Sequence, residues 1–129
     1  MWCDVPGGTV ELEGVEDRFV VEPFAIAKYP ITYRQYGSRL ARTTAVGMYP
    51  QTSSPHGVFD LAGNVWEWCL NKYELPRDCK VSGTGPRVVR GGSWRGDRSL
   101  ARCVGRHDHD PGGRRYFNLG FRVVRVSPI

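Results

Sequence analysis

The sequence predicts a small α+β domain of short antiparallel strands, with one or two short helices and much irregular structure. Three observations predict this class. The 129 residues suffice for one domain with a hydrophobic core, so residues 1–129 are expected to form a single domain. Sixteen glycines and nine prolines favour turns over long helices. Several short stretches alternate apolar and polar residues, as strands do.

The first third of the chain predicts strands separated by proline and glycine turns. Residues 1–21 predict two short strands joined through Pro6-Gly7-Gly8, and residues 19–30 predict a further strand region that bends at Pro23. Thr32 is a candidate N-cap with Gln35 three residues later, which is the spacing of a capping box. A short helix is therefore expected from Thr32 through about Leu40.

The rest of the chain predicts three strand regions and two irregular connections. Residues 46–56 predict a loop, and residues 59–68 predict a compact turn that leads into a strand with Trp66 and Trp68 on one face. Residues 71–86 are polar and predict an irregular connection. Residues 87–93 and 119–126 predict two valine-rich strands that form a hairpin in the core.

Three motifs in order resemble one known family. They are Gly-Asn-Val-Trp-Glu-Trp at 63–68, Arg-Val-Val-Arg-Gly-Gly-Ser-Trp at 87–94, and Gly-Phe-Arg at 120–122. Together they resemble the formylglycine-generating enzyme (sulfatase-modifying factor) superfamily, which implies a C-type-lectin-like fold. The link between Tyr36 and Val46 is brief where the enzymes carry a long insertion, so a minimal version of the fold is expected. Gly91, Gly92 and Ser93 are expected to be architectural, with Trp94 in the core beside Trp66 and Trp68.

The resemblance also implies where catalytic residues would lie, and the chain departs from the family there. In the enzymes, two cysteines after the Gly-Gly-Ser motif bind copper and activate oxygen, because a pair of soft thiolates suits Cu(I). The first position is Gly96 here. The second is Ala101 by direct counting, or lies near Arg98 if a short deletion is allowed, and Cys103 aligns with a non-catalytic cysteine. No copper and no oxidase activity are expected.

The resemblance implies a calcium site as well. The matching groups are the carboxylates of Asp60 and Glu67 and the main-chain carbonyls of Gly63 and Val65. Hard oxygen ligands on a tight turn suit Ca²⁺. The alternative is that the two carboxylates cap the turn or pair with Arg90 or Arg122 without an ion.

Residues after Trp94 have an unusual composition. From Arg95 to Ile129 there is no Lys, Glu, Gln, Met or Trp, and none of these five can be encoded by codons ending in C or T. The pattern resembles the variable region of diversity-generating retroelement proteins, in which adenines of selected codons are randomised. A variable region is therefore expected at 95–118. Its candidate ligand-binding residues are Arg95, Gly96, Asp97, Gly105, His107, His109, Gly113, Arg115, Tyr116 and Phe117.

The chemistry of these residues suits binding. Tyr116 and Phe117 offer apolar anchors, and arginines with His107 and His109 offer adaptable polar contacts. His107-Asp108-His109-Asp110 is alternatively a transition-metal site, since imidazole and carboxylate ligands suit zinc or copper. On a strand, both histidines would point the same way.

The charge distribution and the cysteines limit which ligands, metal sites and compartments are expected. The net charge is +5, and ten arginines with only three acids lie between Arg87 and Arg125. Such a bias indicates an acidic ligand or nucleic acid, or else arginines that pack and pair structurally.

The four cysteines fit no zinc pattern, and free thiols are the default expectation. No apolar run spans a bilayer and no signal peptide is visible, so a cytoplasmic monomer without membrane insertion is expected.

The main hypothesis is a non-enzymatic protein that displays a diversified surface to a protein or other macromolecular ligand. The second is a formylglycine-generating oxidase relative with an altered metal site. The third is a nucleic-acid binder, which is disfavoured because the arginines are interleaved with framework positions and no helix is expected to enter a groove.

Overall fold

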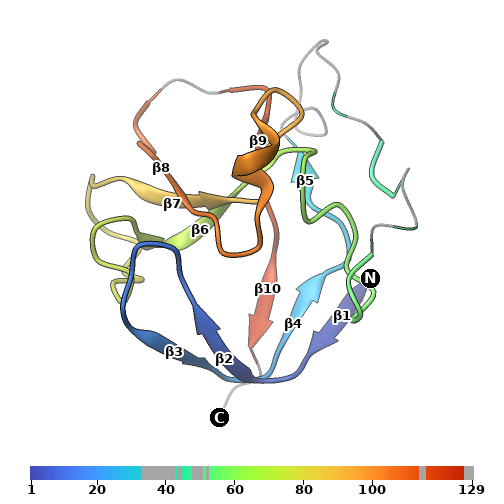
Figure 1. Ribbon diagram of the computed structural model, residues 1–129, viewed down its shortest axis with the longest axis horizontal. Helices are drawn as coiled ribbons and strands as arrows, with labels where there is room; N and C mark the ends of the chain where they lie inside the picture. The colour runs from blue at the N-terminus through green and yellow to red at the C-terminus, as the bar shows by residue number, and fades with distance from the viewer. Residues whose placement is uncertain (33–42, 44, 48–50, 52, 114–115, 127–129) are drawn as a thin grey trace.

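The computed structural model describes residues 1–32, 43, 45–47, 51, 53–113 and 116–126. Within these residues the regular elements are ten strands and the 3-10 helix η3 (Arg98–Ala101) (Figure 1). The structure is thus small and rich in strands, as expected. The helix expected between Thr32 and about Leu40 lies almost wholly outside the described residues. In the described part of the chain, no helix is long and apolar enough to cross a membrane.

The two ends of the chain meet in one sheet. Strands β1 (Trp2–Val5), β4 (Phe24–Ala27) and β10 (Val124–Val126) form an antiparallel sheet in the order β1-β4-β10. Between β1 and β4 the chain makes a hairpin of β2 (Gly8–Glu11) and β3 (Arg18–Val21), which lies to one side of this sheet (Figure 1). The expected strands and the bend at Pro23, between β3 and β4, are confirmed.

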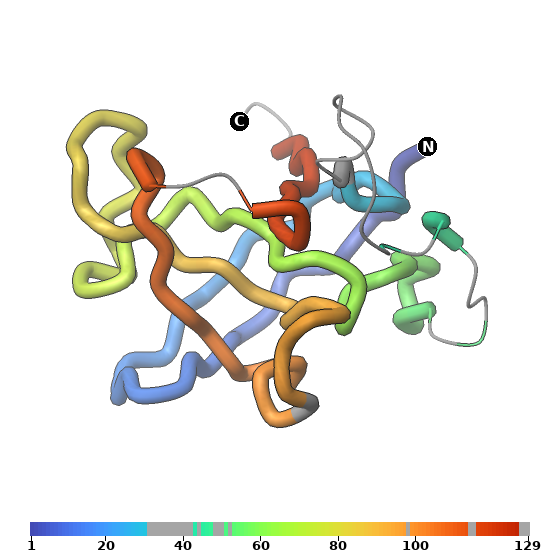
Figure 2. Tube along the Cα trace, turned by 90° about the horizontal axis from the view of Figure 1, so that it is seen from above, coloured from blue at the N-terminus to red at the C-terminus, as the bar shows by residue number. Residues whose placement is uncertain are grey.

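A five-stranded sheet forms the middle of the molecule. Its order is β5-β9-β6-β7-β8, with β5 (Ile31–Thr32), β9 (Leu119–Phe121), β6 (Trp66–Lys72), β7 (Arg87–Arg90) and β8 (His107–His109). Seen from above, the segment that holds β8 runs beside β7 at the end of this sheet (Figure 2). Trp66 and Trp68 start β6 as predicted.

Two sequence predictions about this sheet are wrong. The regions 87–93 and 119–126 do not form a hairpin, because β6 lies between β7 and β9. The strands are also not all antiparallel, since β6 and β9 run parallel with Trp66 opposite Leu119. Parallel neighbours need a long connection, and here about fifty residues separate β6 from β9. The prediction paired strand regions without such a crossover, so it missed the order of this sheet.

The last predicted strand is divided at Arg122. Residues before it join the five-stranded sheet as β9, and residues after it join β4 as β10. Arg122 is buried at this corner, where it bonds to main-chain carbonyls of Ala27 and Lys28. Val124 and Val126 on β10 are 50% and 66% exposed, so this part of the valine-rich strand does not fill the core as predicted.

Among the described residues, the hydrophobic core lies around β7 and the start of β6. Its buried members are Ala25, Val58, Val65, Val88, Val89 and Leu119. Trp94 is 37% exposed, so the prediction that it fills the core is also wrong. Its main chain is nevertheless anchored, since the Trp94 N–H donates to the Asn64 carbonyl at 3.2 Å.

Candidate ligand-binding face and ion site

One face of the five-stranded sheet carries a row of stacked rings. His107 packs edge-on against Trp66 with ring centroids 5.7 Å apart, and His109 packs in the same way against Trp68 at 5.2 Å. Tyr116 then packs against His109 at 5.1 Å. Alternate residues of a strand share a face, so β6 and β8 point these rings to the same side of the sheet. We call these five residues the aromatic face.

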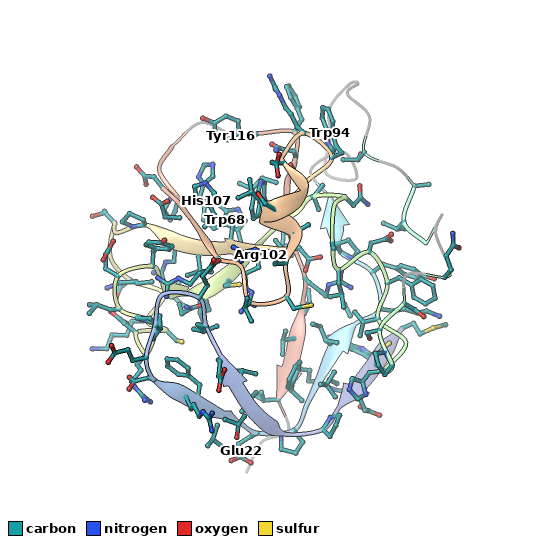
Figure 3. All side chains as sticks on the ribbon, viewed as in Figure 1. Glu22, Trp68, Trp94, Arg102, His107 and Tyr116 are labelled. Carbon is teal, nitrogen blue, oxygen red and sulfur yellow. The ribbon has the colours of Figure 1, made fainter. Side chains whose placement is uncertain are left out.

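The outer members of the aromatic face are open to solvent. Tyr116 is 45% exposed, and the side chain of His107 is 52% exposed. Two further rings are also exposed. Phe117, which follows Tyr116 in the chain, is 49% exposed, and Trp94, which ends the Gly-Gly-Ser-Trp motif, is 37% exposed. Figure 3 places Trp94 and Tyr116 at the end of the molecule opposite Glu22. Exposed rings that are held by their neighbours are typical of protein interaction surfaces.

The loop before η3 presents three of the candidate residues. Arg95, Gly96 and Asp97 are all exposed. Asp97 caps η3, because its Oδ1 accepts a hydrogen bond of 2.7 Å from the Ser99 N–H. This bond stabilises the ionised carboxylate and lowers the pKa of Asp97. The loop is therefore ordered by local bonds while its side chains face solvent.

The remaining candidate residues differ in accessibility. Gly113 is exposed and His109 is half-buried under Tyr116. Gly105 is buried, and a Cβ added there would lie 3.1 Å from the Arg102 carbonyl oxygen. A side chain at Gly105 would thus meet the loop itself, in contrast to its predicted place on the surface. Arg115 lies outside the described residues.

Among the described residues, no third metal-ligating side chain lies with the two histidines. His107 Nδ1 accepts from the Asp108 N–H at 2.8 Å, and His109 Nδ1 lies 3.2 Å from the Asp110 carbonyl oxygen. No group of three His, Cys, Asp or Glu side chains that could hold a metal occurs in the described residues. Since structural zinc sites use four ligands, the histidines are better suited to stacking than to coordination.

The motif carboxylate Glu67 is bound by Arg122. Arg122 Nε and Nη2 donate to the two Glu67 carboxylate oxygens at 2.9 and 2.6 Å. The Arg122 side chain is only 2% exposed and that of Glu67 14%. Arg122 also donates to the carbonyl of Phe59 at 2.9 Å and weakly to that of Asp60. One guanidinium is therefore surrounded by the carboxylate and carbonyl oxygens that would otherwise attract a cation.

The second motif carboxylate, Asp60, is also engaged. It is buried, its φ is +54°, and its Oδ2 accepts a 2.7 Å hydrogen bond from the Gly47 N–H. Of the four predicted calcium ligands, Glu67 has both carboxylate oxygens bonded to Arg122. An ion at Glu67 would compete with that pair. Calcium binding was predicted from the resemblance, and melting experiments test it.

The two positions where the resemblance places copper-binding cysteines carry no thiol. Gly96 and Ala101 stand where the resemblance places the two cysteines. The chain's four cysteines are all free. Burial raises the pKa of Cys69 to about 11, so this thiol keeps its proton at neutral pH.

Several arginines of the basic half are structural. Arg87 is buried and donates to carbonyls of the 80–82 loop and of Leu70. Arg106 donates to the Tyr73 carbonyl and lies over its ring at 4.2 Å. With Arg122 bound to Glu67, a large part of the positive charge is used inside the fold, as the structural alternative predicted.

Sequence reasoning missed that Trp66 and Trp68 form the floor of the candidate face. It placed them on one side of a strand but assigned them to the core with Trp94. The signal was present in two matching alternations, Trp-Glu-Trp on β6 and His-Asp-His on β8. Their stacking depends on β7 lying between them, which only the sheet order shows.

Comparisons with known proteins agree with these motifs. Residues 33–127 match the model of the sulfatase-modifying factor enzyme 1-like domain. A solved structure, Treponema denticola variable protein 1, is similar to this chain with a TM-score of 0.50 and 32% identity, over 66% of this chain and 32% of that one.

Two curated relatives are much longer proteins of different kinds. Serine/threonine-protein kinase pkn1 of Chlamydia pneumoniae is 40% identical over 95 residues, 66% of this chain and 15% of that protein. Formylglycine-generating enzyme of Streptomyces coelicolor is 36% identical over 85 residues, 57% of this chain and 27% of that protein. This chain thus spans only a minor part of the length of either relative.

Proposed function

Because the chain belongs to the family of sulfatase-modifying factor enzyme 1-like domains, we propose that it uses this fold as a non-catalytic scaffold that displays a diversified ligand-binding surface. Its likeness to Treponema denticola variable protein 1 and its small, strand-rich architecture fit the C-type-lectin-like fold that the motifs imply. The ligand is a protein or another macromolecule. The variable region is of the kind that diversity-generating retroelements produce.

The observation that carries this proposal is the aromatic face. Two motif tryptophans on β6 support His107, His109 and Tyr116, all three of which belong to the segment with the biased composition. Rings contribute large contact areas with few rotatable bonds, so a rigid floor beneath changeable residues suits recognition.

The glycines of the Gly-Gly-Ser motif and the candidate position Gly96 just after it differ in how much room they leave for a side chain. A Cβ at Gly91 would lie 2.7 Å from the Leu61 carbonyl oxygen, and one at Gly92 would lie 3.1 Å from Ala101. At Gly96 the nearest atom would be 3.6 Å away, which is ordinary contact. This contrast supports a scaffold that is strict within the Gly-Gly-Ser motif and tolerant just after it.

A pair of display libraries tests the scaffold. One library randomises residues 95, 97, 107, 116 and 117, and a control library of equal size randomises 91, 92, 93, 118 and 120. We expect the first to remain folded in most members and to yield binders to an immobilised test protein such as streptavidin, while the control library yields none. Equal yields from both libraries, or general unfolding of the first, would refute the proposal.

The encoding DNA tests the diversification itself. A near-repeat of the 3′ end that differs mainly at adenines, next to a reverse transcriptase gene, is the expected arrangement. A gene with no such repeat in its neighbourhood would overturn the diversified part of the proposal and leave the binding part standing.

The competing function is copper-dependent oxidation, favoured by the identity with the Streptomyces coelicolor enzyme. Incubation with a sulfatase-motif peptide, Cu(I) and oxygen separates the two. We expect no aldehyde on the peptide cysteine, because Gly96 and Ala101 carry no thiol. Aldehyde formation would overturn the non-catalytic proposal.

A further inference from the structure

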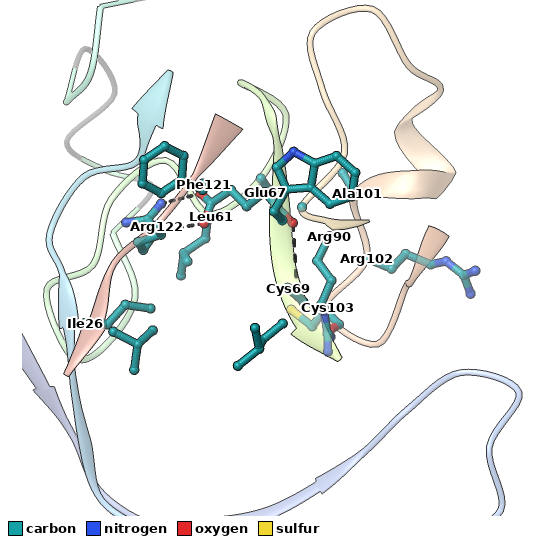
Figure 4. A pocket seen from close by; sticks show the side chains of 15 residues that line it. Ile26, Leu61, Glu67, Cys69, Arg90, Ala101, Arg102, Cys103, Phe121 and Arg122 are labelled. Atoms are coloured by element: carbon teal, nitrogen blue, oxygen red, sulfur yellow. Dashed lines mark hydrogen bonds and ion pairs between the residues drawn. The ribbon is translucent and has the colours of Figure 1, made fainter. Parts of the chain in front are cut away.

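A cavity lies against the five-stranded sheet, and one member of the aromatic face, Trp68, is among its lining residues. It has a volume of about 800 Å³ and lies between β6 and the β4–β10 pair (Figure 4). Glu67, Trp68 and Cys69 of β6 line it, and Trp68 also packs against His109. Volumes of this size accept drug-sized organic molecules.

The walls of this cavity are mainly apolar and they are open. Ile26, Leu61, Phe121 and Val124 line it, and the last three are 41%, 41% and 50% exposed. Water therefore contacts apolar side chains that a ligand would cover. Covering them favours binding of an apolar group, because burial of apolar surface is the main non-directional driving force of association.

One cation in this cavity has no acidic partner among the residues that the structure describes. Arg90 stands directly opposite Glu67 in the β6–β7 register, yet both oxygens of Glu67 are bound to Arg122. Arg90 donates instead to the main-chain carbonyl of Cys103. Among the described residues, no carboxylate lies within ion-pair distance of Arg90. Figure 4 shows its side chain extending along the cavity toward Cys103.

The other cations near the cavity are already paired. Arg122 is bound to Glu67, and Arg102, at the rim, is paired with Glu13. Among the described arginines that line the cavity, a ligand with several negative charges would find only one available guanidinium. A single carboxylate on an apolar body matches both the one unpaired charge and the apolar walls.

We propose that this cavity binds a small monocarboxylic acid with an aliphatic or aromatic body, its carboxylate on Arg90 and its body against Ile26, Phe121 and Val124. The site shares Trp68 with the aromatic face, but none of the described candidate ligand-binding residues lines it. Its proposed ligand is therefore distinct from the macromolecular ligand proposed for the variable region.

Decanoate tests this site, with decanol as the matched neutral probe. Calorimetric titration should show saturable decanoate binding at least tenfold tighter than that of decanol, because hydrogen bonds to charged groups contribute about this factor or more. Arg90→Gln, which keeps a donor for the Cys103 carbonyl, should reduce this preference to about twofold or less. Arg90→Lys should retain most of it. Tyr116→Ala, on the aromatic face, should leave it unchanged.

Three results would overturn the proposal. They are absence of saturable decanoate binding to the folded wild-type protein, equal affinity for decanoate and decanol, and an unchanged preference in a folded Arg90→Gln variant. Far-ultraviolet circular dichroism of each variant checks folding, and Arg90→Lys keeps the test valid if Arg90→Gln unfolds. None of these results bears on the display libraries, so the two proposals fail separately.

Discussion

Arg122 connects more distant parts of the chain than any other side chain described above. It binds Glu67 of β6, the carbonyls of residues 27 and 28 after β4, and Phe59 before the motif turn. Because the guanidinium is buried, removing it leaves Glu67 as an uncompensated buried charge. Such losses cost about 3–5 kcal/mol.

We therefore expect Arg122→Met to lower the free energy of unfolding by about 3–5 kcal/mol, measured by urea denaturation. The control is Arg102→Gln, which breaks the exposed pair with Glu13 and should cost no more than about 1 kcal/mol. Similar losses in the two variants would show that Arg122 is not the buried connector that its contacts indicate.

The raised pKa of Cys69 predicts that the stability of the protein depends on pH. Burial raises its pKa from 9.0 to about 11 in the folded protein. An acid with a raised folded pKa keeps its proton in the native state and loses it in the unfolded state, so stability should fall as pH rises from about 9 toward about 11. Urea denaturation across this range measures the loss, and Cys69→Ala should remove this part of it.

Reactivity gives an independent check on the same thiol. At about pH 8, we expect the exposed Cys79 and Cys103 to react quickly with a thiol reagent while Cys69 reacts roughly a hundredfold more slowly, in line with its pKa. The slow phase should disappear in Cys69→Ala and in urea. A slow phase that remains in Cys69→Ala would show that another cysteine is the protected thiol.

Elements are held in place by close approaches that only glycine permits. The turn after β7 has Gly91 at φ +88° and Gly92 at φ +67°, and the Gly91 carbonyl accepts from the Gly63 N–H at 2.8 Å. The end of β7 is thereby joined to the turn before β6. This hydrogen bond joins the two glycine-containing motifs in the folded protein.

Gly91→Ala should destabilise the protein by about 1–3 kcal/mol, because the new Cβ meets the Leu61 carbonyl at an unfavourable φ. Thermal or urea unfolding measures the change. Gly96→Ala, where a Cβ has ordinary contacts, should change stability by no more than about 0.5 kcal/mol. Equal effects would contradict the division into strict and tolerant positions.

At the scale of the whole molecule, the open question is whether an ion contributes to the fold. With Glu67 held by Arg122, we expect the melting temperature to be the same with millimolar calcium and with a chelator. A calcium-dependent increase in melting temperature, which mass action requires for an ion that binds the folded state, would restore the predicted site at Asp60 and Glu67.

The predictability of the structure follows the range of the contacts involved. The positions of β1, β2, β3, β4 and the start of β6 were predicted, because alternation and proline or glycine turns are local signals. The family was recognised from the motifs, and the match to residues 33–127 confirms it. The hairpin of 87–93 with 119–126, the buried Trp94 and the fully buried last strand were wrong, because each depends on pairing between distant segments.

The candidate site has the same division. The biased composition marked the segment after Trp94, and the alternative to a calcium site was that Asp60 and Glu67 pair with Arg90 or Arg122. The sequence by itself therefore determined the family, the positions of β1 to β4 and of the start of β6, and the segment that we propose to bind ligand. Only the tertiary structure decided that Glu67 pairs with Arg122 rather than Arg90, and that the histidines lie over Trp66 and Trp68. Those choices depend on sheet order and burial, since partners 55 residues apart meet only when the chain has folded.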